Sequence, residues 1–166
     1  VEPGKPAWNE ISKIFGEEIL DPSGNLDRKK LARIVFENKK KKIELEEILH
    51  PRVFESEKLK YESIRKKHPK ALVIVDAALL IESENYKNMD KVVVVDSDEK
   101  TRINRIQARN KMSLDEVVAR MKNQMPGEEK KQYADFILEN SLDKDKLREQ
   151  VKDLNTKLSL LAVENI

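Results

Sequence analysis

The stretch Arg102–Asn140, RINRIQARNKMSLDEVVARMKNQMPGEEKKQYADFILEN, decides the fold, because it runs from basic helices into an apolar strand with a polar end. On a helix, Arg102, Arg105 and Arg109 lie at positions i, i+3 and i+7, so their guanidinium groups project from one face. Each guanidinium is a planar fork that suits phosphate oxygens. The spacing favours a phosphate-binding site, but arginines of a solvated helix that pair with nearby glutamates explain it equally well.

The same part of the chain contains start signals for three helices. Ser97 is a candidate N-cap for the first helix. Ser113 and Glu116 have the spacing of a capping box for the second, and Pro126 opens the third with Glu128 in its first turn. The segment therefore predicts a cluster of short, charged helices.

Three apolar runs, at residues 71–75, 92–95 and 136–138, predict short strands that are buried in a sheet. Helical segments separate the runs, which indicates crossover connections, a parallel sheet and an α/β fold with helical insertions. Ligands of such sheets bind at the carboxyl ends of the strands, so we expect the polar residues there to share one edge. These residues are Asp76, Asp96 and Asn140.

The first third of the chain predicts helices. Pro6 begins a helix that Gly16 ends, and Asp27 caps the next one. A third helix should kink or end near His50, because Pro51 removes an amide donor and crowds the preceding turn.

Composition excludes several classes of protein. Lysine plus arginine at 33 against aspartate plus glutamate at 31 gives a formal charge of +2, which is too balanced for a protein that coats nucleic acid. With 0 cysteines and 2 histidines, the chain has no disulfide framework and no thiolate zinc site. No apolar run is long enough to span a bilayer, and the first residues do not form a signal sequence. We therefore expect a cytoplasmic protein that binds neither nucleic acid nor membrane.

Eight blocks of the sequence, in their order and spacing, resemble the dephospho-coenzyme A kinase family and cover nearly the whole chain. The blocks are GKPAWNEISKIFGEEIL, GNLDRKKLARIVF, LEEILHPRV, LVIVDAALLIE, KVVVV, RINRIQAR, ARMKNQM and ADFILEN. The resemblance implies a P-loop kinase-like fold that transfers the γ-phosphate of ATP to the ribose 3′-hydroxyl of dephospho-coenzyme A. ATP, with Mg²⁺ as its cofactor, and dephospho-coenzyme A are then the implied ligands, in the last step of coenzyme A synthesis.

The resemblance also implies a division of the chain. Residues 1–68 would form a mostly helical domain that binds the coenzyme A acceptor. Residues 69–101 would supply the strands of the core sheet, and residues 102–133 the lid helices. Residues 134–166 would add the last core strand and the C-terminal helix.

The resemblance assigns roles to individual residues. Asp76 stands where a Walker-B-like acid binds Mg²⁺ in catalysis, although an aspartate there also serves as a helix cap. Arg105 and Arg109 resemble lid arginines that stabilise charge on the transferring phosphoryl group. Asn140 resembles the position next to the adenine base, where a turn or helix cap explains an asparagine equally well. The other implied substrate-binding residues are Arg28, His50, Leu79, Leu80, Arg120 and Gln124.

The chain departs from the family in one large respect. The family begins with a strand, a GxxxxGK[ST] loop and a second strand that ends in a catalytic aspartate, and none of these is in this sequence. We expect that roughly 30 to 40 residues of the family's N-terminal segment are missing. The remaining sheet should then have a gap in its hydrogen-bond ladder, and these residues alone should be inactive. The alternative is a non-catalytic protein of this fold that binds a nucleotide, coenzyme A or a partner.

Overall fold

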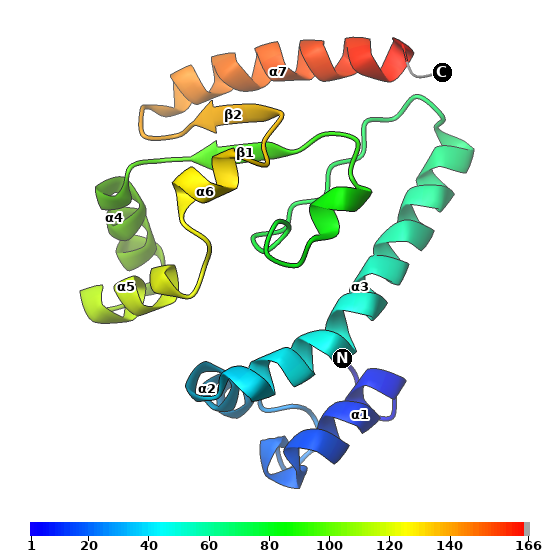
Figure 1. Ribbon diagram of the computed structural model, residues 1–166, viewed down its shortest axis with the longest axis vertical. Coiled ribbons are helices and arrows are strands. Elements are labelled where there is room, and N and C mark those ends of the chain that lie inside the picture. Colours follow the sequence, from blue (N-terminus) through cyan, green and yellow to red (C-terminus); the bar gives the residue numbers. More distant parts are fainter. Residues whose placement is uncertain (165–166) are drawn as a thin grey trace. The chain divides into compact units, whose positions relative to one another are not determined.

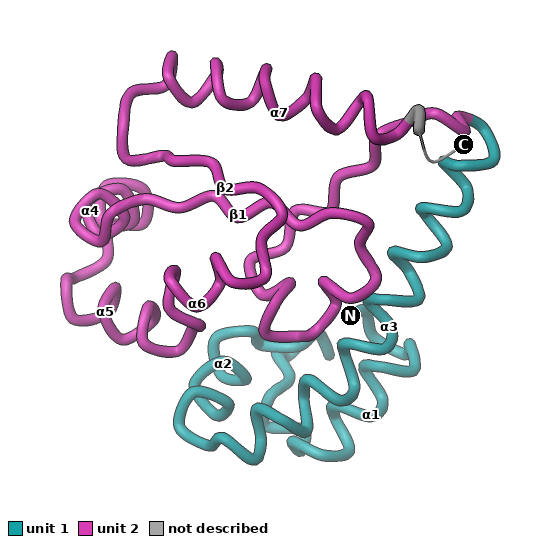
Figure 2. Tube along the Cα trace, turned by 45° about the horizontal axis from the view of Figure 1, so that its top comes forward, with its two compact units in different colours: residues 1–67 teal, residues 68–166 magenta. Residues whose placement is uncertain are grey.

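The computed structural model describes the backbone of residues 1–164 and the side chains of residues 1–162. It divides the chain into two compact units, Val1–Lys67 and His68–Ile166 (Figure 2). The first unit ends next to residue 68, where the sequence predicted the end of a helical domain. The role of that unit in acceptor binding stays a prediction.

The first unit is helical, as predicted. Its elements are α1 (Pro6–Phe15), the short 3-10 helix η1 (Glu17–Ile19), α2 (Arg28–Glu37) and α3 (Lys39–Lys67) (Figure 1). Pro6 occupies the first turn of α1, and Gly16 ends that helix with φ at 81°. The Asp27 carboxylate accepts hydrogen bonds from the amides of Lys29 and Lys30, which confirms Asp27 as the cap of α2. Local sequence signals therefore set both helix starts.

Apolar side chains of the helices form a small core in the first unit. Ile11 of α1 and Ile19 of η1 are fully buried. Trp8 is half-buried, and its indole N–H donates to the Gly24 carbonyl at 3.0 Å. The other buried core residues are Ala7, Phe15, Leu31 and Ile48. The spacing of Ile11 and Phe15 places both on one face of α1, as an amphipathic helix requires.

Helix α3 continues through Pro51, so of the two predicted outcomes, a kink or an end near His50, the end is wrong. The Arg52 guanidinium donates to the Ile48 carbonyl at 2.5 Å and to Glu10 of α1 at 2.6 Å. These contacts, together with the burial of Ile48, hold the helix on both sides of the proline. Tertiary contacts thus outweigh the local cost of proline in a helix.

The second unit contains a small parallel sheet, which confirms the α/β class. Strand β1 (Val93–Asp96) pairs with β2 (Phe136–Glu139) in the register Val93 to Phe136 and Asp96 to Glu139. In Figure 1, α7 (Lys144–Glu164) runs along β2, and α6 (Gly127–Lys131) lies beside β1. The remaining elements are η2 (Asn85–Asn88), α4 (Glu99–Asn110) and α5 (Leu114–Lys122). The helices between β1 and β2 form the crossover that a parallel pair requires.

The predicted strand at residues 71–75 is not a strand in the structure. The described sheet has two strands, and residues 71–77 have no regular structure. Ile74 is 78% exposed and is not buried on both faces as predicted. A strand needs a neighbour for its ladder hydrogen bonds, and β1 and β2 pair with each other.

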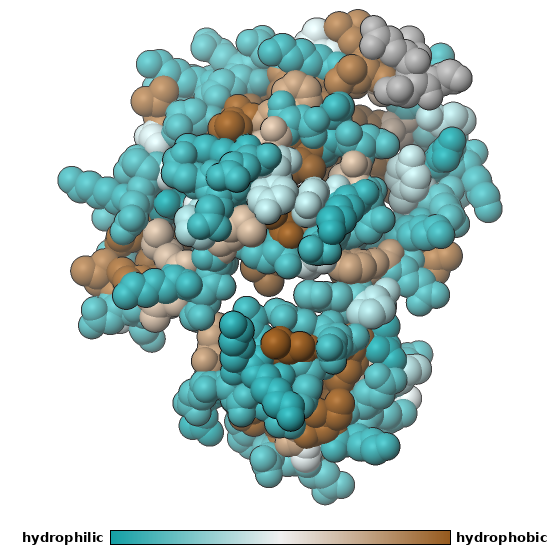
Figure 3. All heavy atoms as spheres, in the orientation of Figure 1, coloured by the Kyte–Doolittle hydropathy of each residue, from teal (hydrophilic) through white to brown (hydrophobic). Residues whose placement is uncertain are grey.

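A second core lies under the sheet, and the surface is mostly hydrophilic. Ile81, Val92 and Val94 are buried, with Tyr86 and Met125 packed against them. Figure 3 shows that hydrophilic residues cover most of the visible face, which fits a chain with 39% charged residues. None of the described helices combines the length and hydrophobicity that crossing a membrane requires.

We expect Ile11→Ala to lower the free energy of unfolding of the first unit by roughly 2 to 5 kcal/mol, because it leaves a cavity. Trp8 is the single tryptophan, so its fluorescence during denaturant unfolding reports on that unit. Ile14→Ala is the matched control on the same helix, because Ile14 is 39% exposed. Equal losses in the two variants would contradict the assigned core.

Candidate active site

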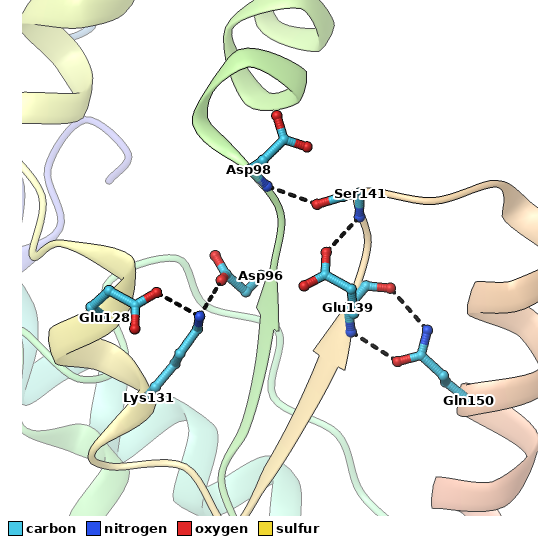
Figure 4. Close-up of polar contacts among 7 residues, drawn as sticks. All are labelled: Asp96, Asp98, Glu128, Lys131, Glu139, Ser141 and Gln150. Carbon is cyan, nitrogen blue, oxygen red and sulfur yellow. Dashed lines mark hydrogen bonds and ion pairs between the residues drawn. The ribbon is translucent and has the colours of Figure 1, made fainter.

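The candidate site lies where β1 and β2 end side by side (Figure 4). Asp96 is the last residue of β1, and Asn140 follows the last residue of β2. The Asn140 amide donates to the Asp96 carbonyl at 2.7 Å, so the parallel ladder continues past the end of β2. Asp96 and Asn140 therefore share one edge of the sheet, as predicted, whereas Asp76, the third residue expected there, does not end a strand in the described structure.

Hydrogen bonds fix the start of α4 beyond this edge. The Asp98 carboxylate accepts the Thr101 amide at 2.8 Å, so Asp98 is the N-cap and the prediction of Ser97 was wrong. Ser97 is buried instead, at 8% exposed. The Asp98 amide donates to the Ser141 hydroxyl at 2.8 Å (Figure 4). The first turn of α4 is thereby attached to the loop that follows β2.

The helices after α4 begin as predicted. Ser113 and Glu116 form the complete capping box at the start of α5. Helix α6 starts directly after Pro126, with Glu128 in its first turn. These starts are local, so the sequence pattern was enough to predict them.

A lysine of α6 binds the Asp96 carboxylate. Lys131 Nζ lies 2.7 Å from Asp96 and 2.6 Å from Glu128 (Figure 4). The Asp96 side chain is 13% exposed. Its hydrogen bond with Lys131 lowers the pKa of Asp96 despite the opposing effect of burial, and the nearby Arg102 acts in the same direction. The two carboxylates in turn raise the pKa of Lys131, so the ion pair persists at neutral pH.

Arg102 of α4 lies close to the same carboxylate. A Cβ atom on Gly127 would be 3.1 Å from Asp96 Oδ1 and 3.5 Å from Arg102 Nη1. The backbone of Gly127 thus fits between these two groups because glycine has no side chain. Arg102 Nε is buried and has no hydrogen-bond partner in the described structure. The end of β1 therefore gathers a carboxylate, an ammonium and a guanidinium group.

The other two arginines of α4 have different partners. Arg105 Nη1 donates to the Asn140 carbonyl at 2.6 Å, which brings Arg105 to the sheet edge. Arg109 Nε donates to Asn110 at 3.0 Å near the far end of the helix and is exposed. The i, i+3, i+7 spacing correctly gives a shared face. It does not bring Arg109 to the sheet edge in this structure, because the distance along the helix separates it from the strand ends.

Asp76 is exposed in the segment that has no ladder partner. The turns that follow it are attached to α6, because Lys130 Nζ lies 2.8 Å from Glu82. Lys131, the next residue of α6, binds Asp96. Adjacent lysines of one short helix thus connect the Asp76 segment with the end of β1.

The remaining predicted residues of the second unit lie in turns and on α5. Leu79 is 41% exposed, and Leu80 is half-buried in the turns that end at Glu84. Arg120 is exposed on α5, and Gln124 is exposed just after it. None of these four side chains has a hydrogen-bond partner that links it to the strand ends in the described structure.

Arg28 and His50, the two residues assigned to the acceptor, lie in the first unit. Arg28 is the exposed first residue of α2. His50 lies inside α3 and stacks on Phe54 with ring centroids 5.7 Å apart. His50 therefore lies inside a helix and not at a helix end.

The residues that connect α6 with the sheet edge were not predicted from the sequence. Lys130, Lys131 and Gly127 gave no signal, because they lie in a short charged segment of a chain with 33 basic residues. Glu82 offered a weak signal, since a glutamate directly after the apolar residues Leu79–Ile81 needs a partner when it is shielded from water.

We expect Lys131→Met to raise the pKa of Asp96 towards its ordinary value of 3.8, because it removes the ammonium group that stabilises the charged form. Carboxyl ¹³C NMR during an acid titration measures this pKa. Lys130→Met is the matched control, since Lys130 contacts Glu82 and not Asp96. The same pKa of Asp96 in the parent and in Lys131→Met would contradict the ion pair.

The lowered pKa also predicts how stability depends on pH. The stabilisation from the ionised Asp96 is present above pH 3.8 and is lost as the pH falls through the lowered folded-state value. The loss of stability that comes from protonating Asp96 at low pH should therefore be absent in Asp96→Asn.

Comparison with curated proteins identifies relatives that match most of the chain. A family model described as dephospho-CoA kinase matches residues 1–146. The dephospho-CoA kinase of Bacillus thuringiensis subsp. konkukian is 41% identical over 140 residues, which cover 84% of this chain and 70% of the relative. The dephospho-CoA kinase of Aquifex aeolicus is 40% identical over 157 residues, which cover 94% of this chain and 78% of the relative.

Solved structures have the same arrangement of elements. The crystal structure of TT1252 from Thermus thermophilus has a TM-score of 0.74 at 33% identity and covers 90% of this chain and 75% of that one. The dephospho-CoA kinase from Campylobacter jejuni has a TM-score of 0.57 at 28% identity, with coverage of 96% and 93%. The chain therefore belongs to the dephospho-CoA kinase family.

Proposed function

We propose that the protein is a dephospho-CoA kinase, which transfers the γ-phosphate of ATP to the ribose 3′-hydroxyl of dephospho-CoA. Membership of the family supports this activity. The observation that carries the proposal is the polar edge of the β1 and β2 pair. Positive side chains meet there beside an ionised Asp96, at the end of a parallel sheet where ligands bind.

The chemistry of phosphoryl transfer explains why such an edge is useful. Catalysis of this reaction consists mainly of positioning and of stabilising negative charge on the transferring group. Arg105 is already directed to the strand ends by its bond to the Asn140 carbonyl. Arg109 is exposed, with a neighbouring asparagine as its partner, so closure of α4 and α5 as a lid can bring it to the phosphates. We assign the second unit to this P-loop kinase-like core and lid.

Asp76 fits the role of a carboxylate that binds Mg²⁺ with the nucleotide. The described residues contain no group of three or more metal-binding side chains. Mg²⁺ in phosphoryl-transfer enzymes does not require such a group, because one or two carboxylates, water and substrate phosphates complete its octahedral shell. The ion would neutralise charge on the phosphates, with Asp76 as its carboxylate ligand.

The other ligand assignments follow the division into two units. The side-chain amide of Asn140 has no hydrogen-bond partner among the described residues and is available to the adenine base. The helical first unit would hold the coenzyme A acceptor through Arg28 and His50. Further acceptor or nucleotide contacts are assigned to Leu79, Leu80, Arg120 and Gln124.

We expect no transfer of phosphate from ATP to dephospho-CoA by these 166 residues alone. They contain no glycine-rich loop whose amides cradle the phosphates. Turnover is expected when a segment of the kind that the family resemblance implies, with a strand, a GxxxxGK[ST] loop and a second strand that ends in an aspartate, is fused ahead of Val1. Radiolabel transfer from ATP, with the Aquifex aeolicus kinase as positive control, measures both cases. Turnover by the chain alone would contradict the account of the loop, and an inactive but folded fusion would favour the non-catalytic alternative.

For the lid, we expect Arg109→Ala to lower kcat of the fusion enzyme by at least about tenfold, the loss of roughly 1.4 kcal/mol of transition-state stabilisation. The KM for dephospho-CoA should change little, because the acceptor is assigned to the other unit. Lys111→Ala, at the end of the same helix, is the control. Equal kcat in the Arg109→Ala variant and the parent would contradict the proposed role of Arg109 in stabilising the transferring phosphoryl group.

A further inference from the structure

We propose that Glu82 and Lys130 form a clamp that positions the Asp76 segment relative to the end of β1. The proposal rests on the proposed function, in which Asp76 binds Mg²⁺ with ATP. All residues of the clamp lie in the part of the chain that the structure describes. Lys130 Nζ lies 2.8 Å from Glu82 Oε1 and 3.1 Å from the Ala78 carbonyl oxygen.

The clamp is shielded from water and has a third member. Glu82 Oε1 also accepts the Met125 amide at 3.1 Å, in the turn between α5 and α6. The side chains of Lys130 and Glu82 are 18% and 21% exposed. Burial opposes the charge on Glu82, but the hydrogen bonds from Lys130 and Met125 outweigh it and lower the pKa of Glu82. Charge-assisted bonds in such surroundings stabilise more than exposed ion pairs do.

The Asp76 segment needs this clamp because it has no strand partner in the described sheet. Ile74 is 78% exposed and Leu79 is 41% exposed, so packing does little to hold the segment. Further along the sequence from Asp76, the Ala78 carbonyl accepts a hydrogen bond from Lys130, and the side chain of Ile81 is buried in the second core. These are the nearest anchors to another element that the described structure shows after Asp76.

Helix α6 connects the clamp to the end of β1. The helix has five residues, Gly127–Lys131, so Lys130 and Lys131 lie next to each other in its last turn. Lys131 binds the Asp96 carboxylate, and Gly127 packs against it. The position of the Asp76 segment is thereby fixed relative to Asp96. Glu82 and Lys130 are positioning residues, since they act on the Asp76 segment and not on the reacting atoms.

The test measures amide hydrogen exchange in the 166-residue chain. Lys130→Met should speed exchange in residues 77–83 by about tenfold, the loss expected for one charge-assisted hydrogen bond. Lys122→Met, at the exposed end of α5, is the matched control and should leave exchange in that segment unchanged. Lys130→Arg should keep the slow exchange, because Glu82 Oε2 is buried without a partner and is available to a second guanidinium nitrogen.

A kinetic measurement separates positioning from general stability. In the fusion enzyme described above, Lys130→Met should raise the KM for Mg·ATP at least about fivefold and leave the KM for dephospho-CoA unchanged. Lys130→Arg should restore the parent values. Unchanged exchange in residues 77–83 of Lys130→Met, or an equal rise of both KM values, would overturn the clamp. A folded fusion without turnover would count against the proposed function, and the exchange comparison would still decide the clamp.

Discussion

The structure of the site depends on the ion pair between Asp96 and Lys131. Asp96 ends β1, and a carboxylate that is 13% exposed needs a charged partner to remain ionised. Lys131 provides that partner, and it draws α6 onto the sheet edge in doing so. The absence of a side chain at Gly127 lets the helix approach closely enough for this contact.

From that pair, a series of polar contacts spreads over the edge. The Asn140 amide continues the ladder onto the Asp96 carbonyl, and the Asn140 carbonyl receives Arg105. Ser141 holds the start of α4 through the Asp98 amide. Each contact joins segments that are far apart in sequence. Family membership gives these contacts a chemical purpose, because a kinase must keep positive groups fixed while negative charge moves.

Local sequence patterns predicted much of this fold, but they failed where contacts between distant segments determine the structure. The caps at Asp27 and Ser113 and the end of α1 at Gly16 were predictable, because neighbouring residues determine them. The apolar runs at residues 92–95 and 136–138 overlap the strands β1 and β2. Residues 71–75 have a strand-like composition, but a strand also needs a partner, which composition cannot supply. Pro51 lies inside α3 because contacts with α1 outweigh its local cost. Asp96 and Asn140 lie at neighbouring strand ends as predicted, whereas Asp76 does not end a strand. The contacts of the α6 lysines could not be predicted, because they form only in the folded chain.

The most direct test of the account is to map the binding of Mg·ATP by NMR on the ¹⁵N-labelled fusion enzyme, which contains the loop that cradles the phosphates. The account predicts that the largest shifts fall at the ends of β1 and β2, at the amides of Asp96 and Asn140 and at the Arg105 side chain. Shifts that cluster away from this edge, with these three groups unchanged, would contradict it.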